Sequence, residues 1–127
     1  MKFIRTILRW LAAIFFIVAG TFHFVKPDMY LQIMPPYFPD PQLLVAVSGL
    51  AEIAGGCGVL IPPLRRVAGW GLIALLIAVF PANIYMLQNH EQFHIAPWIL
   101  WARLPLQIVM GAWVWYVAIQ RPSSKPD

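Results

Sequence analysis

The chain has 127 residues, of which 61% are hydrophobic and 11% are charged, and its formal net charge is +4. Soluble domains average about 25% charged residues, so this composition excludes an ordinary soluble domain and indicates an integral membrane protein. The basic residues lie at the ends of apolar runs and not in a patch interleaved with aromatic residues. Membrane topology therefore explains the positive charge, and nucleic acid is not an expected partner.

The first apolar run covers about residues 3–25 and predicts a membrane-spanning helix. Its basic start resembles a signal peptide, but Thr21 to Val25 follow without a polar cleavage region, so we expect the segment to be retained. Residues 26–41 contain five prolines, which forbid a continuous helix and predict a loop. Within this loop, a short amphipathic turn around Met29 to Met34 is predicted to lie along the membrane surface.

Three further apolar runs predict spans over about residues 42–61, 67–88 and 97–119. The link Pro62-Pro63-Leu64-Arg65-Arg66 is so short that the spans before and after it must be antiparallel neighbours. The predicted fold class is an all-α, integral membrane, antiparallel four-helix bundle. Residues 1–120 form its one domain, and residues 121–127 are predicted to be a disordered cytoplasmic tail.

Four spans put both termini on the same side of the membrane, and most of the basic residues lie on that side. That side has seven basic residues, namely Lys2, Arg5, Arg9, Arg65, Arg66, Arg121 and Lys125. The loops of the other side have Lys26. The positive-inside rule therefore predicts a multi-pass protein with cytoplasmic N- and C-termini.

Glu52 and Arg103 are charged residues inside runs otherwise suited to hydrocarbon. A lone charge near the bilayer centre costs about 2.5–3.5 kcal/mol on insertion scales, so the opposite signs predict that the two side chains face each other inside the bundle. At about 1.5 Å per residue, His23 and Asn83 fall at neighbouring depths, and Gln107 shares the helix face of Arg103. The predicted ligand-binding or structural polar cluster is therefore His23, Glu52, Asn83, Arg103 and Gln107.

Each member of this cluster also has a structural interpretation. A Glu52–Arg103 pair would lock the register of the bundle, and interhelical amide bonds are worth about 0.6 kcal/mol each. His23 would then contact lipid headgroups. No residue is assigned a catalytic role on the sequence alone.

Glycine and proline residues lie near the polar residues in the sequence. The glycines of the second span allow close approach of neighbouring helices. Pro81 and Pro105 each free a carbonyl one turn earlier, near Ile77 and Trp101, and Arg103, Asn83 or water is expected to satisfy it.

Cysteine and histidine offer no metal site. Cys57 is the single cysteine, which excludes an intramolecular disulfide and a cysteine-rich metal site. It is expected to be a small packing residue. His90 and His94 have the i, i+4 spacing of metal ligands but lack a third ligand, so no metal is predicted.

Five pieces of sequence, in a fixed order, carry a family resemblance: AGTFHF at 19–24 with Lys26-Pro27, SGLAEIAGG at 48–56, PPLRR at 62–66, FPANIYM at 80–86 and RLPLQ at 103–107. Over about residues 7–119 the chain resembles the DoxX family of small bacterial membrane proteins. The resemblance implies a four-helix bundle in the bacterial inner membrane. It also implies an association with redox systems, since relatives include a subunit of a thiosulfate:quinone oxidoreductase.

The resulting hypothesis is a membrane subunit or accessory of a quinone- or sulfur-linked redox system. Arg103 would hold an anion or carbonyl oxygen, Glu52 would neutralise Arg103 and accept a proton, and His23 would relay protons. No intrinsic cofactor is expected, and the candidate ligand is a quinone headgroup or a sulfur compound. Expected partners are the lipid bilayer and a redox protein, while enzymatic activity and a homo-oligomer stay open. The alternative is a non-enzymatic assembly or interaction protein with a structural polar cluster, and a small transporter is a third candidate.

Overall fold

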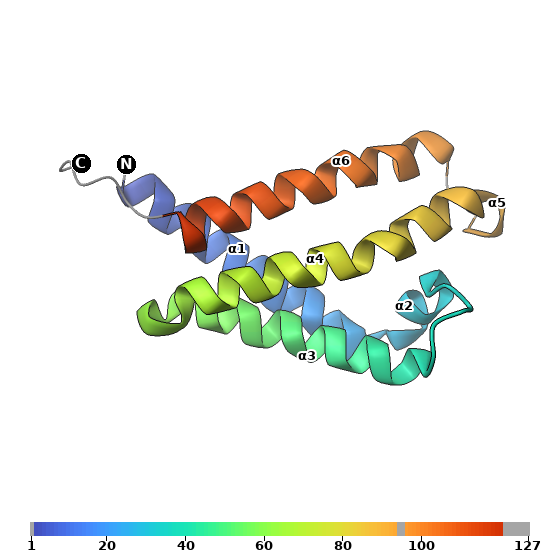
Figure 1. The fold of residues 1–127 in the computed structure, drawn as a ribbon, viewed down its shortest axis with the longest axis horizontal. Helices are drawn as coiled ribbons and strands as arrows, with labels where there is room; N and C mark the ends of the chain where they lie inside the picture. The colour runs from blue at the N-terminus through green and yellow to red at the C-terminus, as the bar shows by residue number, and fades with distance from the viewer. Residues whose placement is uncertain (1, 94–95, 121–127) are drawn as a thin grey trace.

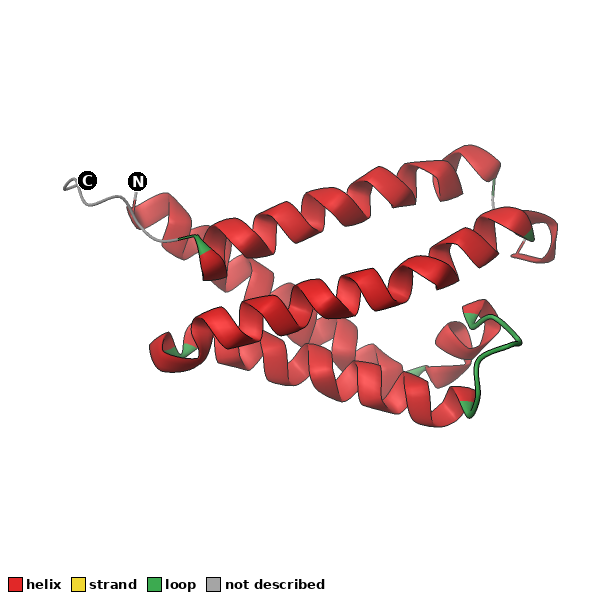
Figure 2. Ribbon diagram, viewed as in Figure 1, coloured by secondary structure: helices red, strands yellow, loops and turns green. Residues whose placement is uncertain are grey.

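Four long helices form the molecule in a computed structural model, which describes residues 2–93 and 96–120. They are α1 (Lys2–Val25), α3 (Pro41–Leu60), α4 (Arg65–Gln88) and α6 (Pro97–Val114), shown in Figure 1. The short elements are α2 (Pro27–Ile33), the 3-10 helix η1 (Pro62–Leu64), α5 (His90–Phe93) and the π-helix η2 (Trp115–Ile119). All four long segments, with η1 and η2 included, are long and apolar enough to cross a membrane. The predicted all-α four-helix bundle is confirmed, and helix dominates the described ranges (Figure 2).

Proline sets the start of three helices. Pro27, Pro41 and Pro97 occupy the first turns of α2, α3 and α6, where a missing backbone N–H costs nothing. The start of α3 is also capped, because the Asp40 side chain accepts a hydrogen bond from the Leu43 backbone N–H at 3.3 Å. The amphipathic turn predicted within the first loop is a helical segment that begins at Pro27, two residues earlier than expected.

Helices α1 and α3 cross at two glycines. A Cβ atom on Gly20 would lie 2.6 Å from the carbonyl oxygen of Gly49, and one on Gly49 would lie 2.6 Å from Cβ of His23. Only hydrogen atoms fit at such a contact, so the backbones approach as in small-residue membrane interfaces. The predicted close approach is confirmed, and it brings the last turns of α1 against the middle of α3.

The hydrophobic core lies toward one end of the bundle. It consists of Ala12, Phe16, Val59, Leu72, Val114, Val117, Ala118 and Ile119. We call this the terminal end, because α1 begins and η2 finishes there (Figure 1). At the opposite end, which we call the α2 end, α3 and α6 spread apart (Figure 1). The two ends therefore differ in packing, and a cavity lined in part by α2 lies at the α2 end.

Arginine side chains at the terminal end bind backbone carbonyls. Arg9 Nε donates to the Val117 oxygen at 2.8 Å, and Arg66 donates to the Ile119 oxygen at 2.6 Å. Arg5 donates to the carbonyl of Gln120, and Arg65 donates to that of Val59. The last carbonyls of a helix have no intrahelical partner, so these cations satisfy them and complement the helix dipole.

Two expectations change or fall outside the structure. Cys57 is exposed and not packed. Its neighbours explain this, because Gly56 faces α1 and Gly58 faces α4, which turns the residue between them outward. The predicted disordered tail at 121–127 and His94 of the paired histidines lie outside the described residues.

Candidate functional site

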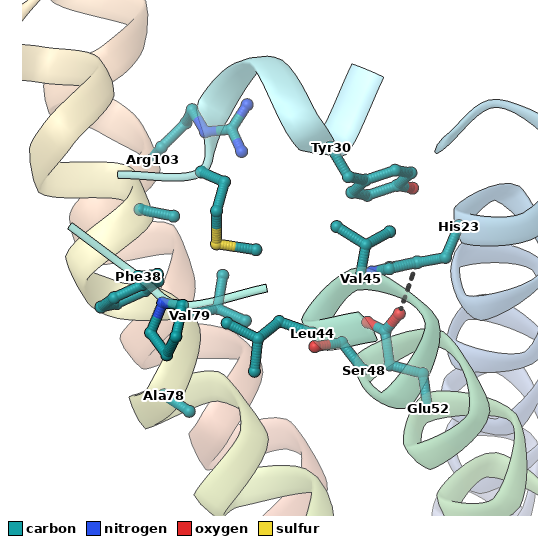
Figure 3. A pocket seen from close by; sticks show the side chains of 13 residues that line it. His23, Tyr30, Phe38, Leu44, Val45, Ser48, Glu52, Ala78, Val79 and Arg103 are labelled. Atoms are coloured by element: carbon teal, nitrogen blue, oxygen red, sulfur yellow. Dashed lines mark ion pairs between the residues drawn. The ribbon is translucent and has the colours of Figure 1, made fainter. Parts of the chain in front are cut away.

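A cavity of about 490 Å³ opens between the helices at the α2 end. We call it the capped cavity, because Tyr30 and Met34 from α2 and the following loop, with Phe38, line it. Figure 3 shows His23 and Glu52 on one wall and Arg103 on the opposite wall, with Ser48 beside Glu52. Apolar side chains from α3 and α4 form much of the remaining lining, including Leu44, Val45, Ala78, Val79 and Ala82. An apolar cavity with a few converging polar groups is the usual form of a small-molecule site.

His23 is the ionisable neighbour of Glu52. Its Nδ1 lies 3.2 Å from Glu52 Oε2 and 2.9 Å from the carbonyl oxygen of Ala19. A carbonyl accepts only, so the Nδ1 hydrogen is directed to Ala19 and fixes the ring orientation. Glu52 Oε2 consequently has an electrostatic contact with His23 but no hydrogen bond in the described part of the chain. The side chains of His23 and Glu52 are 9% and 16% exposed, which makes this a largely desolvated pair.

Tyr30 covers His23 and was not among the predicted site residues. Its ring is stacked on the imidazole with centroids 3.8 Å apart, and its hydroxyl donates to the Ala19 carbonyl at 3.4 Å. Burial raises the pKa of the Tyr30 phenol above its ordinary value, and the nearby Glu52 carboxylate adds to this. The amphipathic pattern of Met29 to Met34 was the available signal for an inward-facing side chain at Tyr30.

A second cavity of about 310 Å³ lies toward the middle of the bundle. We call it the midspan cavity. The midspan cavity adjoins the capped cavity, because both are lined by Glu52, Val79 and Arg103. Asn83 and Gln107 line the midspan cavity together with apolar residues of α1, α4 and α6. All five residues of the predicted polar cluster therefore line one of two adjoining cavities or both.

The two buried amides join α4 to α6. Asn83 Nδ2 donates to Gln107 Oε1, and Gln107 Nε2 donates to the backbone carbonyl of Leu76. That carbonyl is one residue before Ile77, the position at which Pro81 was expected to leave an acceptor in need of a partner. The donor to this neighbouring carbonyl is thus Gln107 and not the expected Arg103 or Asn83, whereas no described side chain binds the Trp101 carbonyl near Pro105.

Arg103 does not pair with Glu52. The Arg103 side chain is exposed, and across residues 2–93 and 96–120 neither an ion-pair nor a hydrogen-bond partner is found for it. The expected face-to-face pairing of the two charges is therefore replaced by a His23–Glu52 contact and a separate guanidinium. The physical reason is the glycine crossing of α1 and α3, which holds His23 beside Glu52 while α6 diverges.

The arrangement offers hydrogen-bond donors on one wall and acceptors on the other. The guanidinium of Arg103 suits an anion or carbonyl oxygen, and the Glu52 carboxyl suits a donor or a proton. Apolar side chains between them suit a hydrocarbon body. Within the described ranges, no group of three or more His, Cys, Asp and Glu side chains is placed to hold a metal ion.

Comparison with known proteins gives one family. No curated protein and no solved structure matches the chain. A family model described as a domain of unknown function, DUF8561, matches residues 11–118, which include all of α3, α4 and α6, most of α1 and every residue of the polar cluster. The chain therefore belongs to the DUF8561 family.

Proposed function

We propose that the chain binds a small amphipathic molecule in the capped cavity and serves as a membrane subunit or accessory of a quinone- or sulfur-linked redox system. The observation that carries the binding proposal is the cavity of about 490 Å³ with Arg103 and Glu52 on opposite walls. The redox setting is the part that the resemblance to DoxX proteins suggests. The description of DUF8561 states no function, so it adds none to this proposal.

Each polar side chain of the two cavities has its own proposed role in binding the ligand. Arg103 holds an anionic or carbonyl oxygen of the ligand, since it has no partner in the described chain and lines both cavities. Glu52 accepts a hydrogen bond or a proton from the ligand, and His23 on α1 contacts the Glu52 carboxyl. Asn83 and Gln107 orient the ligand from the midspan cavity. A quinone headgroup has the oxygen atoms that such a site would hold.

The same proposal places the protein in a bacterial inner membrane with cytoplasmic termini. Support comes from the arginines at the terminal end, namely Arg5, Arg9, Arg65 and Arg66. In a Cys57→Ala background, Tyr37→Cys at the α2 end should react with an impermeant maleimide in intact spheroplasts. Leu64→Cys in η1 should react only after the membrane is opened, and the reverse labelling pattern would refute the orientation.

The second candidate is a non-enzymatic assembly or interaction protein. Specific contacts favour it, because the amide bonds between Asn83 and Gln107 join α4 to α6 and the His23–Glu52 contact lies at the α1–α3 crossing. On this view the polar cluster fixes the relative positions of four helices, and the cavities hold only lipid chains.

Native mass spectrometry of the detergent-extracted chain tests the binding proposal. Wild-type protein should release a bound small molecule on activation, and Ala78→Phe should lose it because Ala78 lines the capped cavity. The matched control is Ala74→Phe. Ala74 is exposed one turn earlier on α4 and lines neither cavity, so its bound molecule should be retained.

Two charge-removing variants separate the candidates. If Glu52→Gln and Arg103→Gln both fold and lose the bound molecule, the cluster is a binding site. If each single variant fails to fold and the double variant folds again, the cluster is structural and the binding proposal is wrong. The separation of Glu52 from Arg103 leads us to expect no such rescue.

A further inference from the structure

The amide bonds between α4 and α6 have a fixed direction. Gln107 donates from Nε2 to the backbone carbonyl of Leu76, which accepts only. The Gln107 amide oxygen must therefore face Asn83, and the Asn83 NH2 group must face that oxygen. The carbonyl of Leu76 thus determines the orientation of both side-chain amides in turn.

This direction leaves an acceptor without a donor. Asn83 is 6% exposed, and its Oδ1 is buried without a hydrogen-bond partner in the described chain. Asn83 lines the midspan cavity with Glu52, whose Oε2 also lacks a donor because the His23 Nδ1 hydrogen is directed to Ala19. A buried acceptor without a donor loses its hydration and gains no bond in return, so a donor in this cavity would stabilise the protein.

We infer that the midspan cavity selects a molecule that donates a hydrogen bond, through a hydroxyl or N–H group, to Oδ1 of Asn83. This inference rests on the proposed binding function and adds the class of ligand. The apolar body of such a molecule lies among Phe15, Leu106 and Met110, which line the same cavity. The class is an amphipathic alcohol, phenol or related donor with a hydrocarbon portion.

The midspan cavity should disfavour a molecule that has no hydrogen-bond donor. A head group whose polar atoms are all carbonyl or ether oxygens has no donor to offer. It would place an acceptor oxygen against the acceptor Oδ1 of Asn83. Turning the Asn83 amide to offer its NH2 group would break the bond to Gln107, whose own orientation is fixed by Leu76. Such a ligand leaves Oδ1 of Asn83 without a donor, so a hydroxyl-bearing, reduced compound should bind more tightly than its oxidised carbonyl form.

A matched pair of probes tests this in the purified full-length chain. 4-Hexylphenol has a hydroxyl donor, and 4-hexylanisole replaces it with a methyl ether of similar shape. The affinity of each is measured by calorimetric titration into protein in detergent, with protein-free micelles as the blank. Wild type should prefer the phenol by about tenfold, as expected from one hydrogen bond.

Two variants test the mechanism. Asn83→Leu should reduce the preference to about the level of free partitioning, because the acceptor is gone. Gln107→Met keeps Asn83 but frees its amide to turn, so it should also abolish the preference, with any change in affinity shared by both probes. If Asn83→Leu fails to fold, Gln107→Met alone decides the test.

The outcomes separate the two proposals. Equal affinity of wild type for both probes, with loss of both in Ala78→Phe, overturns the donor inference and leaves the binding function standing. Absence of binding by either probe, with no molecule released from the native protein, overturns the binding function and the donor inference together. A preference that survives in Gln107→Met also overturns the inference, because the amide direction then plays no part.

Discussion

The imidazole of His23 and the phenol of Tyr30 form a stacked pair, with ring centroids 3.8 Å apart and planes 19° from parallel. Both side chains also direct a hydrogen bond to the carbonyl oxygen of Ala19. A residue from the short helix α2 thereby covers a residue of α1 that contacts Glu52. The loop between two spans is thus part of the capped cavity, and its removal should change the site more than the membrane anchoring.

Tyr30→Phe should alter stability mainly at alkaline pH. The folded-state pKa of Tyr30 is raised above the unfolded value of about 10, so the folded chain holds the phenol proton more tightly. This contribution is complete below the unfolded pKa and is lost as pH rises through the folded pKa. Thermal melting from pH 8 to 11 should therefore show a steeper alkaline decline for wild type than for Tyr30→Phe, and parallel curves would contradict it.

Gly20→Ala and Gly49→Ala should each destabilise the bundle. The added Cβ would lie 2.6 Å from the Gly49 carbonyl in the first case and 2.6 Å from His23 Cβ in the second. Overpacking of this kind costs about 1–3 kcal/mol, measurable as the free energy of unfolding in mixed micelles.

The control for this prediction is Gly111→Ala on α6. A Cβ on Gly111 meets nothing within 4 Å, so the substitution should be neutral or stabilising by up to about 1 kcal/mol through helix propensity. Equal losses at Gly49 and Gly111 would show that the α1–α3 crossing is not the cause.

Asn83→Leu and Gln107→Met should be strongly non-additive. Removing Gln107 leaves the Asn83 NH2 group and the second acceptor position of the Leu76 carbonyl unsatisfied, which costs about 1–3 kcal/mol. Once one amide is gone, removing the other costs less. A double-mutant cycle on unfolding free energies should give a coupling of about 1 kcal/mol, and strict additivity would argue against the bond between them.

Arg66→Gln should destabilise the terminal end. The Arg66 guanidinium donates to the Ile119 carbonyl at 2.6 Å, and a hydrogen bond from a charged group contributes about 1.5–3 kcal/mol. Hydrogen exchange should accelerate at the end of η2 in this variant. Lys2→Gln is the control, because Lys2 is exposed at the start of α1 and its loss should leave that exchange unchanged.

Hydropathy was sufficient to predict the four spans. The expected second span, 42–61, is observed as Pro41–Leu60, and the fourth agrees through η2. The bilayer thickness fixes the length of an apolar run, and proline marks its ends, so both signals are local. The five polar residues singled out in the apolar runs each line one or both of the two cavities, although the Arg103 side chain is exposed.

The partners within the cluster were not predictable in the same way. Opposite charge suggested Arg103 as the partner of Glu52, but the distance is decided by helix crossing, which depends on Gly20 and Gly49 together. Tyr30 was missed because a loop segment that folds back onto a bundle leaves only a weak periodic signal. Cys57 was predicted to be a packed residue because free cysteine is usually buried. Its two glycine neighbours, Gly56 and Gly58, occupy the buried positions instead.

The packed terminal end and the hollow α2 end have a consequence for kinetics. The core and the arginine–carbonyl bonds lie at one end, whereas the capped cavity at the other end is covered by the short helix α2 and its loop. We expect local opening of α2 to require far less free energy than separation of the four helices. A molecule bound in the capped cavity, as we propose, would then exchange with the bilayer on a timescale set by that opening, while the bundle as a whole stays folded.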